Sequence, residues 1–262
     1  MITLNSDAAS TSLSKTTKAI LNEYGIKLNK NLGQNYLIDR NKRDQIIQFG
    51  NLTKDDVVLE IGPGIGTLTI ELAKRVKKVI AIEQDSNICQ ILENRLKKEN
   101  IDNVELINDD ALNVEFPKFD KIISNLPYQI SSPITFKFLN YDFQLAILMY
   151  QKEFASRMNG KVGSKDYSRL SAMLYFKCDV DLLTGVSAES FIPKPKVDST
   201  VVRLTPKLPE LNGQLKHLNI NEINEKDFTI IRLSVRLLGI VCPTTDKGCM
   251  CRKQYHLRNR TG

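Results

Sequence analysis

The strongest constraint on the fold is a short apolar run that ends in a glycine-rich loop and leads into a helical pattern. Residues 57–61 read VVLEI, residues 62–66 read GPGIG, and residues 67–76 read TLTIELAKRV with apolar side chains at helical spacing. Continuous apolar runs of this length are typical of strands buried on both faces. The glycines interrupt the pattern between strand and helix. This segment therefore predicts a strand, a tight loop and a helix.

The same unit recurs along the chain. A second apolar run at 79–83 precedes a charged segment with a helical apolar face, and further runs follow at 104–108, 121–125 and 145–150. Strands that alternate with helices imply right-handed crossovers and a parallel sheet covered on both faces. We expect an α/β fold with a doubly wound, mostly parallel sheet of the Rossmann-like type.

The last part of this pattern has a different character. Residues 170–176 (LSAMLYF) have a helical apolar pattern, whereas residues 179–186 (DVDLLTGV) and 199–206 (STVVRLTP) are typical of strands. We expect these two strands to pair antiparallel at an edge of the sheet.

Composition divides the chain into three parts. Residues 1–30 are rich in Ser, Thr, Asn and Lys, and we expect a flexible arm with at most a short helix from Thr17 to Tyr24. Residues 31–206 carry the alternating pattern and form the main domain. Residues 207–262 turn polar and then Cys- and Arg-rich, and we expect a divergent, incomplete C-terminal region that is partly helical or disordered.

The charge balance favours a polyanionic partner. The 262 residues include 37 Lys and Arg against 30 Asp and Glu, a net charge of +7. Clustered basic residues gain affinity for phosphate backbones through counterion release. No stretch approaches the roughly 18 uncharged apolar residues of a membrane span, and no secretory signal is recognised. The odd number of cysteines, five, does not suit a secreted disulfide framework. We therefore expect a cytoplasmic protein with no membrane partner.

The glycine loop stands where an open α/β sheet binds ligands, at the junction of a first strand and a first helix. A dinucleotide fingerprint G-x-G-x-x-G would need a glycine at Thr67, but the third glycine is Gly66. The form found here, G-x-G-x-G after the acidic Glu60, is the pattern of methyltransferases that use S-adenosyl-L-methionine. Gly62 and Gly64 would let the backbone approach the cofactor closely.

Two acidic residues follow the next two strands. Glu83 closes the second strand, and Asp110 follows the third in the sequence Asn-Asp-Asp-Ala-Leu. A carboxylate at the first place can accept both ribose hydroxyls of an adenosine, and one at the second can accept from the adenine amino group. Because parallel strands end at one rim, the three features together predict a nucleoside cofactor site.

The fourth strand leads into Asn125-Leu126-Pro127-Tyr128, which resembles the catalytic motif of amino-methyltransferases. An exocyclic adenine nitrogen is a poor nucleophile because its lone pair is delocalised into the ring. The Asn125 side-chain oxygen and the Leu126 carbonyl can accept its protons and localise charge on nitrogen. Pro127 fixes the turn, and Tyr128 offers a face to a flipped base. Positioning and electrostatics suffice for this transfer without a metal.

A zinc site in the tail is a weaker alternative. Its potential ligands are Cys242, Cys249, Cys251 and His256. The C-x-C spacing is too tight for the usual C-x2-C knuckle, so we predict no metal site.

Over residues 28–206 the chain resembles the KsgA-like family of ribosomal RNA small-subunit adenine N6-dimethyltransferases. The resemblance rests on 31–37 (NLGQNYL), the glycine loop, Glu83, the DDAL and SNLPYQISSPI stretches, and 191–199 (FIPKPKVDS). It implies transfer of two methyl groups to each of two adjacent adenosines in the loop of the 3′-terminal helix of small-subunit rRNA. The implied substrate is the immature small ribosomal subunit, during assembly, and the implied protein is a monomer.

The resemblance also implies roles for individual residues. Asn35 and Leu37 would cover the cofactor, which Gly62, Glu83, Asp110 and Asn125 would line. Phe191 would sandwich the target base opposite Tyr128. Basic residues near these motifs would contact RNA phosphates, namely Lys27, Lys30, Arg157, Lys161, Lys165, Arg169, Lys194 and Lys196.

Two other functions are compatible with the motifs. One is a non-catalytic RNA-binding assembly factor that keeps the methyltransferase fold. The other is an adenine methylase of large-subunit rRNA, because erythromycin-resistance methylases share the fold and the N-terminal motif. The complete 191–199 stretch favours the small-subunit enzyme.

Overall fold

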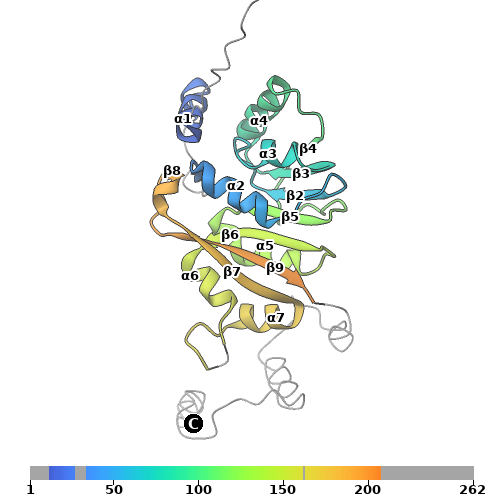
Figure 1. The fold of residues 1–262 in the computed structure, drawn as a ribbon, viewed down its shortest axis with the longest axis vertical. Coiled ribbons are helices and arrows are strands. Elements are labelled where there is room, and N and C mark those ends of the chain that lie inside the picture. Colours follow the sequence, from blue (N-terminus) through green and yellow to red (C-terminus); the bar gives the residue numbers. More distant parts are fainter. Residues whose placement is uncertain (1–11, 27–33, 162, 208–262) are drawn as a thin grey trace, which may run out of the picture.

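A seven-stranded sheet forms the centre of the computed structural model, which describes residues 12–26, 34–161 and 163–207. The strand order is β4-β3-β2-β5-β6-β9-β7 (Figure 1). The strands are β2 (Val57–Ile61), β3 (Lys78–Glu83), β4 (Val104–Asn108), β5 (Lys121–Asn125), β6 (Leu145–Gln151), β7 (Cys178–Val186) and β9 (Ser199–Pro206).

Strands β2 to β6 are parallel to one another, as the alternating sequence pattern predicts. The chain order reverses between β2 and β5, so their carboxyl ends leave a crevice at the place where ligands bind in open sheets. Strand β9 inserts antiparallel between β6 and β7. The doubly wound α/β fold and the antiparallel edge pair are thereby confirmed.

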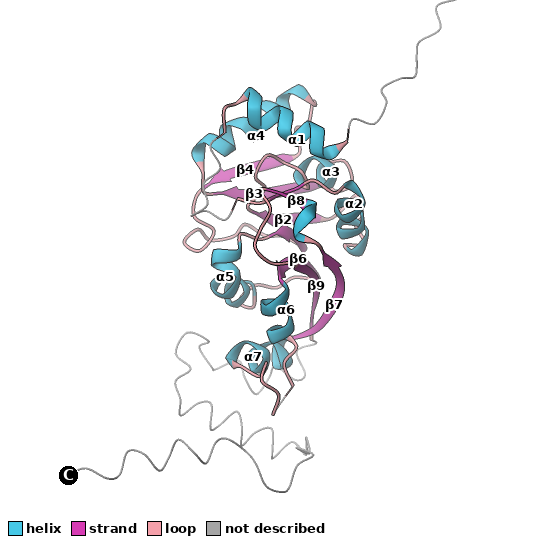
Figure 2. Ribbon diagram, turned by 90° about the vertical axis from the view of Figure 1, so that its left-hand side faces the viewer, coloured by secondary structure: helices cyan, strands magenta, loops and turns pink. Residues whose placement is uncertain are grey.

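Helices cover both faces of the sheet (Figure 2). The helices of this domain are α2 (Arg40–Phe49), α3 (Thr69–Ala73), α4 (Ser86–Lys98), α5 (Ser131–Phe138), α6 (Lys152–Met158) and α7 (Arg169–Lys177). Helices α2 and α3 pack on one face, and α5, α6 and α7 pack on the other. This two-sided burial explains why the parallel strands are continuously apolar rather than alternating.

Helix α1 (Leu13–Glu23) lies within the segment expected to be an arm; it overlaps the short helix expected from Thr17 to Tyr24 and begins four residues earlier. The Ser12 side chain caps its first turn by accepting from the Lys15 N–H. Gly25, at φ 57°, ends it, with the Ile26 N–H donating to the Leu21 carbonyl. Ile20, 8% exposed, is the buried apolar side chain of α1 and packs in a cluster with α4. This contact is long-range, so the short apolar pattern of residues 12–26 does not reveal it.

A two-stranded sheet lies beside the main one. Strand β1 (Tyr36–Leu37) pairs antiparallel with β8 (Phe191–Ile192), and this joins the first and last motifs of the domain. Within the described ranges, no helix is long and apolar enough to cross a membrane. The expectations for residues 208–262, including the four potential zinc ligands, and for Lys27 and Lys30 lie outside the described residues.

Candidate active site

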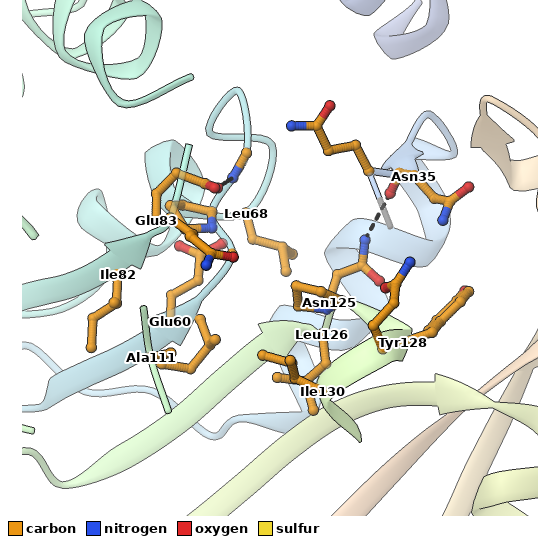
Figure 3. A pocket seen from close by; sticks show the side chains of 18 of the residues that line it. Asn35, Glu60, Leu68, Ile82, Glu83, Ala111, Asn125, Leu126, Tyr128 and Ile130 are labelled. Atoms are coloured by element: carbon orange, nitrogen blue, oxygen red, sulfur yellow. Dashed lines mark hydrogen bonds between the residues drawn. The ribbon is translucent and has the colours of Figure 1, made fainter. Parts of the chain in front are cut away.

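A pocket opens at the rim where β2, β3, β4 and β5 end (Figure 3). It is bounded by the loop after β2, by the segment that leads into β1, and by the loop after β5. Ten of the eleven predicted site residues line it: Asn35, Leu37, Gly62, Gly64, Glu83, Asp110, Asn125, Leu126, Pro127 and Tyr128. The fold therefore brings together motifs that are as much as 93 positions apart in the sequence.

The glycine loop requires glycine at three of its positions. Gly62, Gly64 and Gly66 have φ values of 66°, 56° and 88°, which disfavour residues with a Cβ atom. A Cβ atom on Gly64 would lie 2.8 Å from the ring of Tyr36, and one on Gly62 would lie 3.0 Å from Pro127. The loop is thus in close contact with both the N-terminal motif and the catalytic motif.

Glu83 is held in place by backbone donors. Its Oε2 accepts from the Gly64 N–H at 3.1 Å, and its Oε1 accepts from the Asp85 N–H at 3.0 Å. Burial nevertheless raises the pKa of Glu83 above its ordinary value. A fixed carboxylate at the end of the second strand has spare lone pairs that could accept from two neighbouring hydroxyls.

Glu60 is a pocket residue that the sequence analysis used only to recognise the loop pattern. It is 2% exposed, and its Oε2 has no hydrogen-bond partner among the described residues. Burial raises the pKa of Glu60 to about 8; the nearby Thr69 hydroxyl opposes this shift and the negative charge of Glu83 adds to it. A buried acceptor without a partner is costly unless a ligand satisfies it. Glu60 and Glu83 together therefore suit a cationic, hydroxyl-bearing ligand such as S-adenosyl-L-methionine.

The third strand end supplies a tightly turned acidic loop. Asp110 Oδ1 accepts from the Leu112 N–H at 2.9 Å, and its Oδ2 accepts from the Asn113 side chain at 3.2 Å. Asp110 still lines the pocket, together with the buried Ala111. The loop thus presents the carboxylates of Asp109 and Asp110 and the apolar side chain of Ala111, which suits the polar edge and the flat face of a purine.

The catalytic motif is oriented by its neighbours. The Asn125 Nδ2 donates to the main-chain carbonyl of Asn35 at 3.1 Å (Figure 3). Because a carbonyl can only accept, this contact defines which end of the amide carries nitrogen and makes Oδ1 the acceptor end. Ser124 Oγ donates to the Ile61 carbonyl at 2.6 Å, and this buried contact ties β5 to β2 just below the pocket. Sequence reasoning missed Ser124, since its partner is 63 positions away.

Tyr128 is anchored to the last motif of the domain. Its hydroxyl lies 2.6 Å from Ser199 Oγ at the start of β9. Ser199 is completely buried. This bond holds one end of the ring, so the orientation of Tyr128 is set before any base arrives. Ser199 is the last residue of the 191–199 motif, and the sequence alone indicates no role for it.

Phe191 is not in the pocket. It is 2% exposed and packs in the core with Leu37, its partner across β1 and β8, and with Val201. The prediction that it faces Tyr128 across the base is therefore not met in this structure. The pairing of β8 with β1 turns the ring towards the sheet, and the core there is apolar enough to bury it.

The family described as ribosomal RNA adenine dimethylase matches residues 25–230. The chain belongs to this family. The match spans most of the chain and includes the glycine loop, the acidic strand ends and the Asn-Leu-Pro-Tyr motif. The prediction of an S-adenosylmethionine-dependent rRNA adenine dimethyltransferase is confirmed at this level.

Two similar proteins carry names that fit this family. The chain is 54% identical over 191 residues to a probable ribosomal RNA small subunit methyltransferase A of Methanosphaera stadtmanae, covering 73% of this chain and 70% of the relative. It is 46% identical over 223 residues to one of Pyrococcus abyssi, covering 84% and 82%.

Two solved structures have the same fold. One is a dimethyladenosine transferase from Plasmodium falciparum, with a TM-score of 0.65 and 40% identity over 71% of this chain and 66% of the other. The second is the 23S rRNA methyltransferase ErmE, with a TM-score of 0.60 and 33% identity over 66% and 70%. Both comparisons support the methyltransferase fold of this dimethylase domain.

The six predicted basic residues within the described ranges are exposed, and three of them line a second hollow of the domain. Lys165, Lys194 and Lys196 line it together with Lys152, which sequence reasoning missed. Acidic side chains lie there too, and Lys194 forms an ion pair with Glu189 just outside the hollow. Arg157, Lys161 and Arg169 are exposed on the adjoining segment and do not line it.

Proposed function

We propose that this dimethylase transfers methyl groups from S-adenosyl-L-methionine to N6 of two adjacent adenosines in the loop of the 3′-terminal helix of small-subunit rRNA. Its substrate is the immature small ribosomal subunit, and the modification accompanies subunit assembly. The observation that carries the proposal is the bond from Asn125 Nδ2 to the Asn35 carbonyl. It leaves an acceptor oxygen beside the pocket, where it could accept from the target amine and localise the lone pair on nitrogen. Relatives named as small subunit methyltransferases support the choice of rRNA.

When bound, the cofactor supplies a methyl group on a positively charged sulfonium. Glu60 would accept from a cationic group of the cofactor, because its Oε2 has no partner among the described residues. Glu83 would accept from ribose hydroxyls while Gly64 and Asp85 hold its carboxylate. Asp110 and Ala111 would bind the adenine end.

The reacting adenosine enters from the side of Tyr128. Asn125 Oδ1 and the Leu126 carbonyl accept from its exocyclic amine, and this localises the lone pair on nitrogen. Tyr128 offers its ring face to the base, in a position fixed by Ser199. Stacking of this kind is worth about 1 to 3 kcal/mol per base. No side chain needs to form a covalent bond.

The lysine-lined hollow gives the RNA strand a path away from the catalytic loop. It includes Asp198, which immediately precedes the Ser199 that anchors Tyr128. Ammonium groups there would contact phosphates that flank the target and make binding sensitive to salt. Base selection would remain with the pocket itself.

Methyl incorporation into small subunits that lack the modification tests the proposal. Wild-type protein with labelled cofactor is expected to label the small subunit, and Asn125→Ala is expected to lose at least about 99% of the rate, because the amine then lacks a positioned acceptor. Asn140→Ala, an exposed asparagine at the end of α5, is the matched control and should keep full activity.

The other functions predict different outcomes. A non-catalytic assembly factor would bind small subunits without labelling them. A large-subunit methylase would label large-subunit rRNA in preference. An Asn125→Ala variant that is as active as wild type would refute the role of Asn125.

A further inference from the structure

Lys137 lies on α5, the helix that begins directly after the catalytic loop, and reaches across to the loop that follows β4. Its Nζ donates to the carbonyl oxygens of Ala111 at 2.9 Å and Leu112 at 3.1 Å, and also to that of Val114. An ammonium group has three N–H donors, so this arrangement uses all of them. The residue was not singled out in the sequence.

The surroundings of Lys137 hold its side chain in this position. The side chain is half-buried, and its Nζ lies 4.4 Å from the ring centre of Phe116. Burial lowers the pKa of Lys137, and the charges of Glu115, Asp110 and Asp109 oppose that shift. A partly buried cation is stable only where acceptors replace its water. The three carbonyls supply them.

The loop that Lys137 holds is part of the active-site pocket. Ala111 and Asp110 line the pocket on one side of the loop, and the Lys137 ammonium binds the loop through its carbonyls. Asp110 fixes the turn internally by accepting from the Leu112 N–H. Two sets of bonds thus act on the same few peptide units, one from within the loop and one from α5.

Helix α5 connects this loop to the Asn125–Tyr128 segment. It runs from Ser131 to Phe138 and follows the 3-10 turn Tyr128–Ile130 of the catalytic motif without a break. A displacement of the 109–114 loop relative to α5 would therefore change the position of Asp110 with respect to Asn125. Lys137 joins α5 to the 109–114 loop through its three hydrogen bonds.

We propose that Lys137 is a positioning residue for the adenine end of the cofactor. It fixes the 109–114 loop against α5, so that Asp110 and Ala111 are in place when the cofactor binds. The inference rests on the proposed function, since it assumes that a nucleoside occupies this end of the pocket. It predicts an effect on binding of the adenosine part, with little effect on methyl transfer once the site is full.

The test compares two ligands and one rate in purified full-length protein. Lys137→Met removes the donors but keeps an unbranched side chain. Calorimetry should show the Kd of S-adenosyl-L-methionine rising about tenfold, because small displacements of binding groups are costly. The Kd of 5′-methylthioadenosine, which lacks the amino-acid end, should rise by the same factor. The kcat at saturating cofactor should stay within about twofold of wild type.

Two further variants sharpen this result. Lys118→Met, at an exposed lysine four positions after Val114, is the matched control and should leave both Kd values unchanged. Lys137→Arg keeps the charge but spreads its donors over a rigid fork that matches three converging carbonyls less well. Its Kd values should lie between those of wild type and Lys137→Met.

The outcomes separate this inference from the proposed function. Unchanged Kd values in Lys137→Met, or a lowered kcat at unchanged Kd, would overturn the inference while leaving the enzyme's function intact. If both Lys137 variants fail to fold, the residue serves stability and the inference is again overturned. Failure of the wild-type protein to bind cofactor would instead refute the proposed function.

Discussion

The hydroxyl of Tyr128 and the Oγ of Ser199 lie 2.6 Å apart, and this bond joins the catalytic loop to the first residue of β9. The two residues are 71 positions apart in the chain. Because Ser199 is fully buried and paired within the sheet, it is a fixed point for the ring. The aromatic residue that we propose stacks on the target base is therefore positioned by the strand that follows the basic 194–196 segment.

This anchor predicts a graded loss of activity. Tyr128→Phe and Ser199→Ala should each lower kcat about 5- to 10-fold, corresponding to about 1 kcal/mol for one hydrogen bond. The double variant should lose no more than either single variant, since both remove the same bond. Tyr128→Ala, which also removes the stacking face, should lose about 100-fold. Single-turnover rates check this series, and fully additive losses in the double variant would contradict the anchor.

The glycine loop predicts that a Gly→Ala substitution weakens cofactor binding at one position and not at another. Gly64→Ala should weaken cofactor binding severely, because its Cβ would meet the Tyr36 ring at 2.8 Å and the loop would shift. Gly163→Ala is the matched control, because Gly163 also has a positive φ, 87°, but nothing lies within 4 Å of its Cβ position. Both variants carry about 1 to 2 kcal/mol of backbone strain. Calorimetric titration with cofactor should distinguish them, and equal Kd values would refute the steric argument.

Glu60 predicts a pH dependence of cofactor binding. Burial and the charge of Glu83 raise its pKa to about 8 in the free protein, while a cationic ligand requires the carboxylate. Binding should therefore release a proton at neutral pH, and the Kd should rise up to about tenfold for each pH unit below 8. Calorimetry in buffers of different ionisation enthalpy measures this proton. Glu60→Gln should abolish its release, and a Kd that is constant from about pH 6 to 8.5 would contradict the assignment.

The same shift has a consequence for the cofactor-free protein. A carboxyl group whose folded-state pKa lies above its ordinary value of 4.5 favours the folded state only while it is protonated. The free energy of unfolding should therefore fall as the pH rises from about 4.5 through 8. Urea unfolding at several pH values checks the sign, and the slope should be smaller in Glu60→Gln.

A buried ion pair lies at the end of β5 remote from the pocket, and we expect it to affect stability and not cofactor binding. Lys121 Nζ lies 2.9 Å from Asp56 Oδ2 and donates to the Asn51 carbonyl, at the opposite end of β5 from Asn125. Lys121→Met should lower the free energy of unfolding by about 3 to 5 kcal/mol, because it leaves Asp56 buried and without its cation. The cofactor Kd should not change at temperatures where the variant is folded. A changed Kd would show that the two ends of the sheet are coupled.

The parts of the site that could be predicted from sequence are those in which one short segment carries the whole signal. Gly62, Glu83 and Asp110 each follow an apolar run, and parallel strands place their carboxyl ends on one rim. The parallel sheet itself followed from the same alternation. These features require no knowledge of how distant segments pack.

The residues that sequence reasoning missed depend on partners far along the chain. Ser124, Ser199 and Lys137 act through bonds to groups 23 to 71 positions away. Phe191 illustrates the converse case, because its motif suggests an exposed loop, whereas pairing of β8 with β1 buries the ring. The start of helix α1 at Leu13 could not be predicted for a similar reason, since Ile20 packs with α4 as well as with its own neighbours.

Mass spectrometry of small-subunit rRNA 3′ ends, after incubation of unmodified subunits with the protein and S-adenosyl-L-methionine, tests the proposed activity most directly. We expect four added methyl groups, two on each of two adjacent adenosines in the 3′-terminal loop, and none with Asn125→Ala. Methyl groups on any other nucleotide, or an unmodified 3′ end with wild-type protein that binds cofactor, would contradict it.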